Sequence, residues 1–355
     1  QYAMLACGYV DAIAAHETAI LQYMKDNNAV FRILEEPLLV TGLGVAFAKN
    51  DSRGLDHQLN DTFAQMREDG TMELICPLCG EALEKREKQY ICANGHSFDI
   101  ARQGYVNLLT VQHKHSLDPG DTKEQVLSRR AFLDGGFYAP IAEALITAAK
   151  KYGASGEILD VGCGEGYYCS RLSQALNLPL TGLDISKEAV RWAAGRYKNA
   201  QWLCATAAHI PVETGSAGVL TSLFALTLPE EFHRVLREDG LFLQVVAAED
   251  HLLGLKGIIY DQLTHKEKHV TQALPGFRLL SSENIRFSFT VEGEQVRQLL
   301  SMTPHVFRIG KAGAERLANT ERLTDTASCV LNVYRRLPAY LPQTEDGYAG
   351  KNLKE

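Results

Sequence analysis

The chain has 355 residues, which is room for two or three domains, and its hydrophobic content of 46% and charged content of 22% are ordinary for a globular protein. It contains no apolar run of about 18 residues and no recognisable signal peptide, so the sequence predicts neither a membrane span nor export. The formal net charge of −7 argues weakly against a nucleic-acid partner, but such binding depends on local patches rather than on the total.

The first 71 residues differ from the rest, because they carry ten acidic residues against five basic ones. A strand-like segment follows Glu36-Pro37-Leu38, and a later helical pattern ends at Asp69-Gly70-Thr71. This order resembles the C-terminal part of periplasmic amino-acid solute-binding proteins. Such proteins bind ligand between two lobes, so we expect one partial lobe to be an inactive fragment. The expected helices are 17–25 and 56–68; an apolar run lies at 31–34, and 44–49 is strand-like.

From residue 72 onward the pattern predicts an α/β protein. Residues 72–110 carry cysteines at metal spacing, and 111–135 are polar and turn-rich. Helical periodicity over 124–151 is broken around 135–140, and alternating strands and helices then indicate a mostly parallel sheet with helices on both faces. The last two strands have no long crossover helix after them, so we expect an antiparallel pair near the sheet edge. Expected strands are 157–161, 180–184, 200–204, 217–223, 240–247, 278–289 and 327–335; expected helices are 166–176, 186–197, 229–237, 251–263 and 292–302.

Four residues have the spacing of a structural zinc site, namely Cys76, Cys79, Cys92 and His96. Zn²⁺ binds three thiolates and an imidazole in a tetrahedron, and with four protein ligands no position remains open for catalysis. A redox Cys-x-x-Cys is the alternative, but it leaves Cys92 and His96 without a role. The other five of the eight cysteines lie in apolar contexts typical of buried thiols in a reducing compartment, so we expect a cytoplasmic protein.

The segment between the two ligand pairs fits a short β-hairpin with a charged tip. Lys85, Arg86 and Lys88 lie at this tip and can meet phosphates. A hairpin this small cannot hold a core of its own, so we expect it to serve as a recognition element.

A second motif begins where the apolar strand 158–161 ends. The dinucleotide fingerprint has two residues between its second and third glycines, whereas only Glu165 separates Gly164 from Gly166. This spacing suits a cofactor without a phosphate, and Asp184, at the end of the next strand, can accept hydrogen bonds from both ribose hydroxyls. Together these features indicate S-adenosylmethionine. The cofactor-binding residues expected from the motif are Asp160, Gly162, Gly164, Glu165, Gly166 and Asp184.

The metal hairpin followed by this glycine loop resembles the RlmA family, the 23S rRNA (guanine-N1)-methyltransferases, over nearly all of 72–335. The resemblance implies a Rossmann-like class I methyltransferase with an N-terminal zinc ribbon. It also implies methyl transfer from S-adenosylmethionine to N1 of a guanine in a 23S rRNA hairpin, and a homodimer that forms a cleft for RNA. The expected domains are the fragment 1–71, the zinc ribbon 72–110, linker and helices 111–150, the methyltransferase domain 151–336 and a tail 337–355. Matching stretches include 76–79, 104–109, 118–121, 129–133, 162–168 and 251–260.

The resemblance also implies finer points about the site. Tyr138 and His251 match positions that contact the cofactor, and Tyr138 is expected to cover it. The Tyr-Val-Asn-Leu-Leu stretch at 105–109 is nearer to the branch that acts at position 745 than to the branch at 748. No residue is identified as the base that removes the proton from N1; Asp118 and Asp121 are candidates, but their Asp-Pro-Gly-Asp sequence is also a common turn.

One loop departs from the family pattern. Relatives carry a proline-cysteine-lysine stretch after the fourth strand, whereas this chain reads Leu-Phe-Ala-Leu-Thr-Leu-Pro-Glu-Glu over 223–231. That loop usually borders the target base, and Phe137, Tyr138 and Phe224 are candidates to stack on a base that is turned out of its helix. Two alternative functions therefore stay open. One is a small-molecule methyltransferase whose zinc ribbon holds two subunits together as a dimer. The other is a non-catalytic fusion product.

Overall fold

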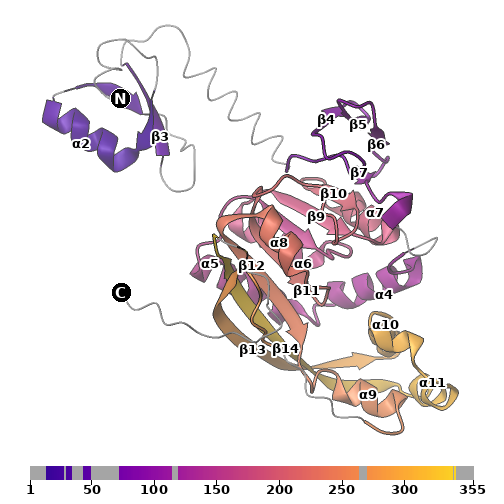
Figure 1. Cartoon of the computed structure of the whole chain (residues 1–355). Helices are drawn as coiled ribbons and strands as arrows, with labels where there is room; N and C mark the ends of the chain where they lie inside the picture. The colour runs from indigo at the N-terminus through magenta and orange to yellow at the C-terminus, as the bar shows by residue number, and fades with distance from the viewer. Residues whose placement is uncertain are drawn as a thin grey trace. The chain divides into compact units, whose positions relative to one another are not determined.

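The computed structural model describes residues 13–27, 29–33, 43–48, 72–113, 119–263, 270–338 and 340, and the chain forms two compact units, Gln1–Gly70 and Thr71–Glu355 (Figure 1). In the first unit, helix α2 (Glu17–Asn27) accompanies a three-stranded antiparallel sheet of order β1-β3-β2. These strands are β1 (Ile13–His16), β2 (Phe31–Ile33) and β3 (Leu43–Ala48). The helix expected over 17–25 is thus present, β2 lies in the apolar run and β3 in the strand-like segment, and the expected helix 56–68 lies outside the described residues.

The second unit is built on an eight-stranded sheet of order β13-β14-β12-β11-β8-β9-β10-β7 (Figure 1). The strands from β12 to β7 in this order pair in parallel, and β14 pairs antiparallel with both β12 and β13. The predicted antiparallel pair at one edge is therefore confirmed. At the other edge lies β7, a three-residue strand that the sequence did not reveal. The strands are β7 (Tyr105–Asn107), β8 (Ile158–Val161), β9 (Leu180–Asp184), β10 (Gln201–Cys204), β11 (Ala217–Leu223), β12 (Leu236–Ala247), β13 (Phe277–Glu292) and β14 (Arg322–Arg336).

Helices lie where the alternating pattern predicted them, with α11 as an addition. The expected break around 135–140 separates α4 from α5. Helix α4 begins with a capping box in which Thr122 and Gln125 bond each other's backbone, and Gly136, with φ of 79°, lies in the turn between the two helices. The helices are α4 (Lys123–Asp134), α5 (Ala139–Lys151), α6 (Tyr167–Leu176), α7 (Lys187–Arg196), α8 (Pro229–Val235), α9 (Leu253–Ile259), α10 (Glu294–Ser301) and α11 (Lys311–Ala318). No helix in the described ranges is long and apolar enough to cross a membrane.

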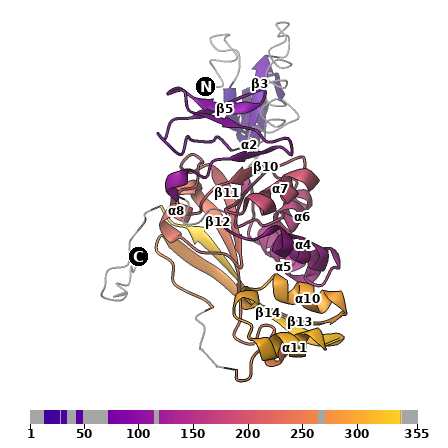
Figure 2. The same ribbon diagram turned by 90° about the vertical axis from the view of Figure 1, so that its right-hand side faces the viewer.

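The sheet is apolar on both faces, as a parallel sheet covered by helices requires. Along β8, Ile158 belongs to one buried cluster and Leu159 to the other, and neither side chain is exposed. The first cluster includes side chains of α5, α6 and α7. The second includes α8 together with apolar residues of the 72–92 segment. The helices α9, α10 and α11 gather beside the far ends of β13 and β14 (Figures 1 and 2).

The close approach of the Trp202 ring explains why residue 182 is a glycine. A Cβ placed on Gly182 would lie 2.3 Å from Cζ3 of Trp202, a fully buried ring on the neighbouring strand. We expect Gly182→Ala to destabilise the protein by about 1–3 kcal/mol, because the buried indole must shift to admit the methyl group. Urea unfolding measures this change in the free energy of unfolding.

Gly195→Ala is the matched control. Gly195 lies in α7, and a Cβ there meets nothing within 4 Å, so alanine should stabilise the helix by up to about 1 kcal/mol. Destabilisation of equal size at both positions would contradict the steric explanation.

Candidate active site and metal centre

The metal centre is formed by the four residues that the spacing predicted. The donor atoms of Cys76, Cys79, Cys92 and His96 all lie within 4.8 Å of one another. His96 Nδ1 is 3.5 Å from Cys76 Sγ and 3.4 Å from Cys92 Sγ, and the sulfurs of Cys79 and Cys92 are 3.7 Å apart. A zinc tetrahedron with ordinary bond lengths has edges of about 3.6 Å between sulfur and nitrogen and about 3.8 Å between sulfurs. The cluster therefore fits Zn²⁺ with four protein ligands.

Tight turns hold these ligands. The amide of Gly80 donates to the carbonyl of Cys76, and the amide of Gly95 donates to that of Cys92. Both glycines have φ near 80°, a left-handed conformation that favours glycine. A three-stranded antiparallel sheet completes the ribbon, with strands β4 (Leu83–Arg86), β5 (Gln89–Cys92) and β6 (Ser97–Asp99).

The ribbon shares the core of the main sheet, as its small size required. Leu74 pairs with Val212 in an isolated bridge, and Gln201 of β10 donates a hydrogen bond of 3.2 Å to the hydroxyl of Tyr90. Cys76 and Cys92 themselves belong to the buried cluster on this face. The basic tip, formed by Lys85, Arg86 and Lys88, stays exposed.

The glycine loop leaves β8 and enters α6 at the carboxyl end of the parallel strands. Gly162, Gly164 and Gly166 all have positive φ, between 56° and 83°. The amide of Gly164 donates to Oδ2 of Asp184 at 2.9 Å, and the amide of Ser186 donates to Oδ1 at 2.8 Å. Burial raises the pKa of Asp184, and these two hydrogen bonds oppose the shift. Asp184 is thus fixed at the end of β9, where the sequence analysis expected an acceptor for ribose hydroxyls.

Asp160 lies beneath the loop rather than in front of it. Its side chain is only 3% exposed, and its Oδ1 accepts a hydrogen bond of 2.5 Å from Thr221 Oγ1 on β11. Burial raises the pKa of Asp160 to about 6, although hydrogen bonds from Thr221 and Cys169 oppose the shift. Thr221 is a partner that the motif did not predict.

Glu165 is buried in an ion-pair cluster that the sequence analysis missed. Its Oε2 lies 2.7 Å from Nε of Arg129, and Nη1 of Arg129 lies 2.5 Å from Oδ2 of Asp121. Burial disfavours the charged guanidinium, but the carboxylates of Glu165 and Asp121 outweigh this effect and raise the pKa of Arg129. The only sequence signal was the pair of arginines at 129–130, and the linker residue Asp121 reaches the loop through this contact.

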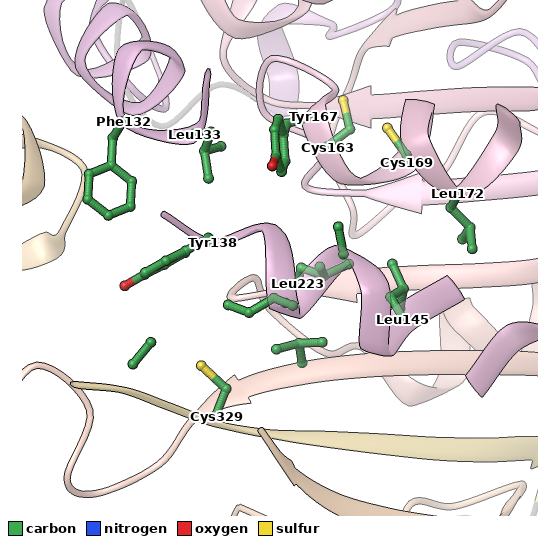
Figure 3. Close-up of a cluster of buried hydrophobic side chains, with 14 of the residues drawn as sticks. Phe132, Leu133, Tyr138, Leu145, Cys163, Tyr167, Cys169, Leu172, Leu223 and Cys329 are labelled. Carbon is green, nitrogen blue, oxygen red and sulfur yellow. The ribbon is translucent and has the colours of Figure 1, made fainter. Parts of the chain in front are cut away.

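Tyr138 and His251 meet each other, although 113 positions separate them. The Tyr138 hydroxyl lies 3.3 Å from His251 Nε2, and its ring is edge-on to that of Phe132. Burial raises the pKa of Tyr138. Tyr138 belongs to the same buried cluster as Cys163 of the glycine loop and Tyr167 (Figure 3).

Phe224 borders this pair from the loop over residues 223–231. Its ring centroid is 6.0 Å from that of His251, and its side chain is 43% exposed. The loop also reaches the glycine loop, because a Cβ on Gly162 would lie 2.6 Å from that of Ala225. Of the other stacking candidates, Phe137 is partly buried and packs beside Phe132, and Tyr138 is 2% exposed. Asp118 lies outside the described residues.

Comparisons with known proteins agree with this arrangement. A family model described as RlmA, N-terminal matches residues 74–117, and one described as Methyltransferase domain matches residues 158–240. The 23S rRNA (guanine(748)-N(1))-methyltransferase of Streptomyces fradiae is 32% identical over 284 residues, which cover 77% of this chain and 100% of the relative. A provisionally named 23S rRNA (guanine-N1)-methyltransferase of Micromonospora griseorubida is 33% identical over 300 residues, which cover 76% of this chain and 99% of the relative.

The tetrahedral geometry leads to a prediction about metal content. Cys92→Ser should purify with far less than one zinc per chain and with a lower melting temperature, because three ligands cannot close the tetrahedron. Elemental analysis and thermal unfolding measure the two quantities. Cys204→Ser is the control, since Cys204 is buried in β10 outside the cluster, and it should keep its zinc. Equal zinc in both variants would contradict the assignment.

The burial of Asp160 leads to a prediction about pH. Because its pKa is raised from 3.8 to about 6 in the folded protein, ionisation of Asp160 destabilises the fold as pH rises between these values. Asp160→Asn removes this titration, so its stability relative to the original protein should increase between about pH 4 and pH 7, by at most about 3 kcal/mol. Denaturant unfolding across this range measures the difference. Asp239→Asn, at an exposed position, controls for the loss of one surface carboxylate; a flat difference for Asp160→Asn would contradict the argument.

Proposed function

Since this chain belongs to the RlmA family of 23S rRNA (guanine-N1)-methyltransferases, we propose that it transfers a methyl group from S-adenosylmethionine to N1 of a guanine in a hairpin of 23S rRNA. The observation that carries the proposal is the similarity to the Streptomyces relative over that protein's full length, together with the zinc-ribbon and methyltransferase matches in this chain. The metal is structural zinc, because all four ligands come from the protein.

The glycine loop and the carboxylate beside it suit the adenosyl cofactor. S-adenosylmethionine, when bound, supplies a methyl carbon that its sulfonium activates. Asp184 Oδ1 and Oδ2 each accept one backbone amide, and each oxygen has a further lone pair for a ribose hydroxyl. The chain's main contribution is alignment of the two reactants, which lowers the entropy cost of the transfer. The roles of Tyr138, His251 and Glu165 toward the cofactor stay predictions.

The acceptor base has to leave its pairing partner before the transfer, because N1 lies on the pairing edge of guanine. Among the three aromatic candidates, Phe224 is exposed at 43%, whereas Phe137 is partly buried and Tyr138 is buried, so we propose that Phe224 stacks on the extruded base. The exposed Lys85, Arg86 and Lys88 can meet phosphates of the same hairpin. Asp121 is engaged with Arg129, which disfavours it as the base for N1.

Further expectations about this protein remain proposals. The resemblance favours position 745, whereas the Streptomyces relative is named for position 748. It also implies a homodimer with a cleft for RNA, and work on ribosomal RNA implies the cytoplasm. The likeness of residues 1–71 to solute-binding proteins, and the expectation that they form an inactive fragment, also stay predictions.

Primer extension tests the function directly. The zinc-loaded protein is incubated with S-adenosylmethionine and 23S rRNA that lacks the modification, and reverse transcriptase is run across the hairpin. Methylation at N1 blocks base pairing, so we expect a new stop that depends on the cofactor and whose position identifies the guanine. Asp184→Ala should abolish the stop.

Two results would contradict the proposal. Label transferred from S-adenosylmethionine only to small molecules would favour a small-molecule methyltransferase. Cofactor binding without turnover on any RNA would favour a non-catalytic protein.

A further inference from the structure

One buried nitrogen beside the glycine loop has no partner among the described residues. Arg129 uses Nε for Glu165 and Nη1 for Asp121, but its Nη2 is buried and makes no hydrogen bond there. The Arg129 side chain as a whole is 20% exposed, although Nη2 itself is buried. A charged N–H group that is buried without an acceptor is costly, so its retention calls for an explanation.

The unpaired nitrogen faces the glycine loop. A Cβ placed on Gly164 would lie 3.3 Å from Nη2, which makes this nitrogen the atom nearest to that face of the glycine. The same residue donates its amide to Asp184, the expected ribose acceptor. Arg129 is therefore adjacent to the loop on which the cofactor is expected to lie.

The charges around the loop make this position distinctive. The buried thiol of Cys163 in the loop interacts electrostatically with three carboxylates, those of Asp184, Asp160 and Glu165, and with one cation, Arg129. A ligand that brings another carboxylate to this loop would be repelled by the three acidic groups. Within the described residues, Arg129 is the cation placed to offset that repulsion.

We propose that Nη2 of Arg129 binds the α-carboxylate of the methionine part of S-adenosylmethionine. This inference rests on the proposed cofactor and adds a residue that recognises one end of it. Arg129 is a suitable donor because guanidinium groups present several N–H groups in a fixed plane and bind carboxylates with charge-assisted hydrogen bonds. Glu165 and Asp121 hold the plane in place from two sides.

A purely structural role is the alternative. The carbonyl of Asp121 accepts a hydrogen bond from Ser186 Oγ at 2.7 Å, so Arg129 also ties the linker turn to the loop. Loss of such a clamp would weaken the binding of every ligand at the site to a similar degree. Loss of a carboxylate-binding group would weaken only ligands that carry the carboxylate.

Calorimetric titration with two probes separates these roles. The probes are S-adenosylmethionine and its decarboxylated form, which lacks only the carboxylate. The original protein should prefer the intact cofactor by about 10–100-fold in Kd, as expected for a hydrogen bond to a charged group. Arg129→Met should bring this ratio close to one, mainly by weakening the intact cofactor, and Arg129→Lys should give a ratio in between.

Arg130→Met is the matched control, because Arg130 is the next residue on α4 but lies over the Trp192 ring and pairs with Asp134. It should keep the ratio of the original protein. The inference would be overturned if Arg129→Met kept the same ratio of the two Kd values as the original protein. If the methionine variant does not fold, an unchanged ratio in Arg129→Lys would overturn it. It would also be overturned if the original protein bound both probes equally well. Because no RNA is present, failure of methylation with the preference intact would count against the proposed acceptor and leave the inference standing.

Discussion

The site depends on the crowding of carboxylates at the carboxyl end of one parallel sheet. Asp160, Glu165 and Asp184 converge on one short loop, and burial raises the pKa of the first and the last of them. Such groups are tolerated only when hydrogen bonds and opposite charge compensate for their loss of water. The Thr221 hydroxyl donates a hydrogen bond to Asp160, and two backbone amides donate to Asp184. Glu165 is balanced by the opposite charge of Arg129. Each carboxylate is thereby fixed in position before any ligand binds.

The zinc ribbon follows from a second constraint, the limited core that a segment of this size can form. Two features stabilise the ribbon despite its small core. A metal cluster closes its turns, and its apolar residues join the core of the main sheet. Tyr90 adds a polar link through Gln201, which in turn accepts a hydrogen bond from Thr181. The basic tip is therefore carried on a support that continues directly into the sheet on which the glycine loop is built.

Much of this could be predicted from the sequence, because periodicity and spacing are local properties. The parallel strands, the antiparallel edge pair and the four metal ligands all follow from such patterns. The sequence could not reveal β7, since three residues are too few to show a period, and its pairing with β10 is a tertiary contact. Nor could it reveal that Arg129 meets Glu165, 36 positions away, or that Thr221 lies under Asp160. Those contacts arise only in the folded chain, when helix α4 meets the glycine loop and strand β11 lies beside β8.

Backbone strain marks the side of the site where the base is proposed to bind. Phe224 has φ of 55° and Leu252 has φ of 56°, a left-handed conformation that costs a non-glycine residue about 1–3 kcal/mol. Phe224 lies against His251, and Leu252 follows His251 directly, so both strained residues border the same histidine. His251 is held in turn by the carbonyl of Ser328 on β14 and by Tyr138. A strained backbone conformation persists only where the surrounding structure holds it in place. Here the strained loop holds an exposed aromatic ring beside the glycine loop. The 223–231 loop thus supplies an exposed aromatic ring at this side of the site.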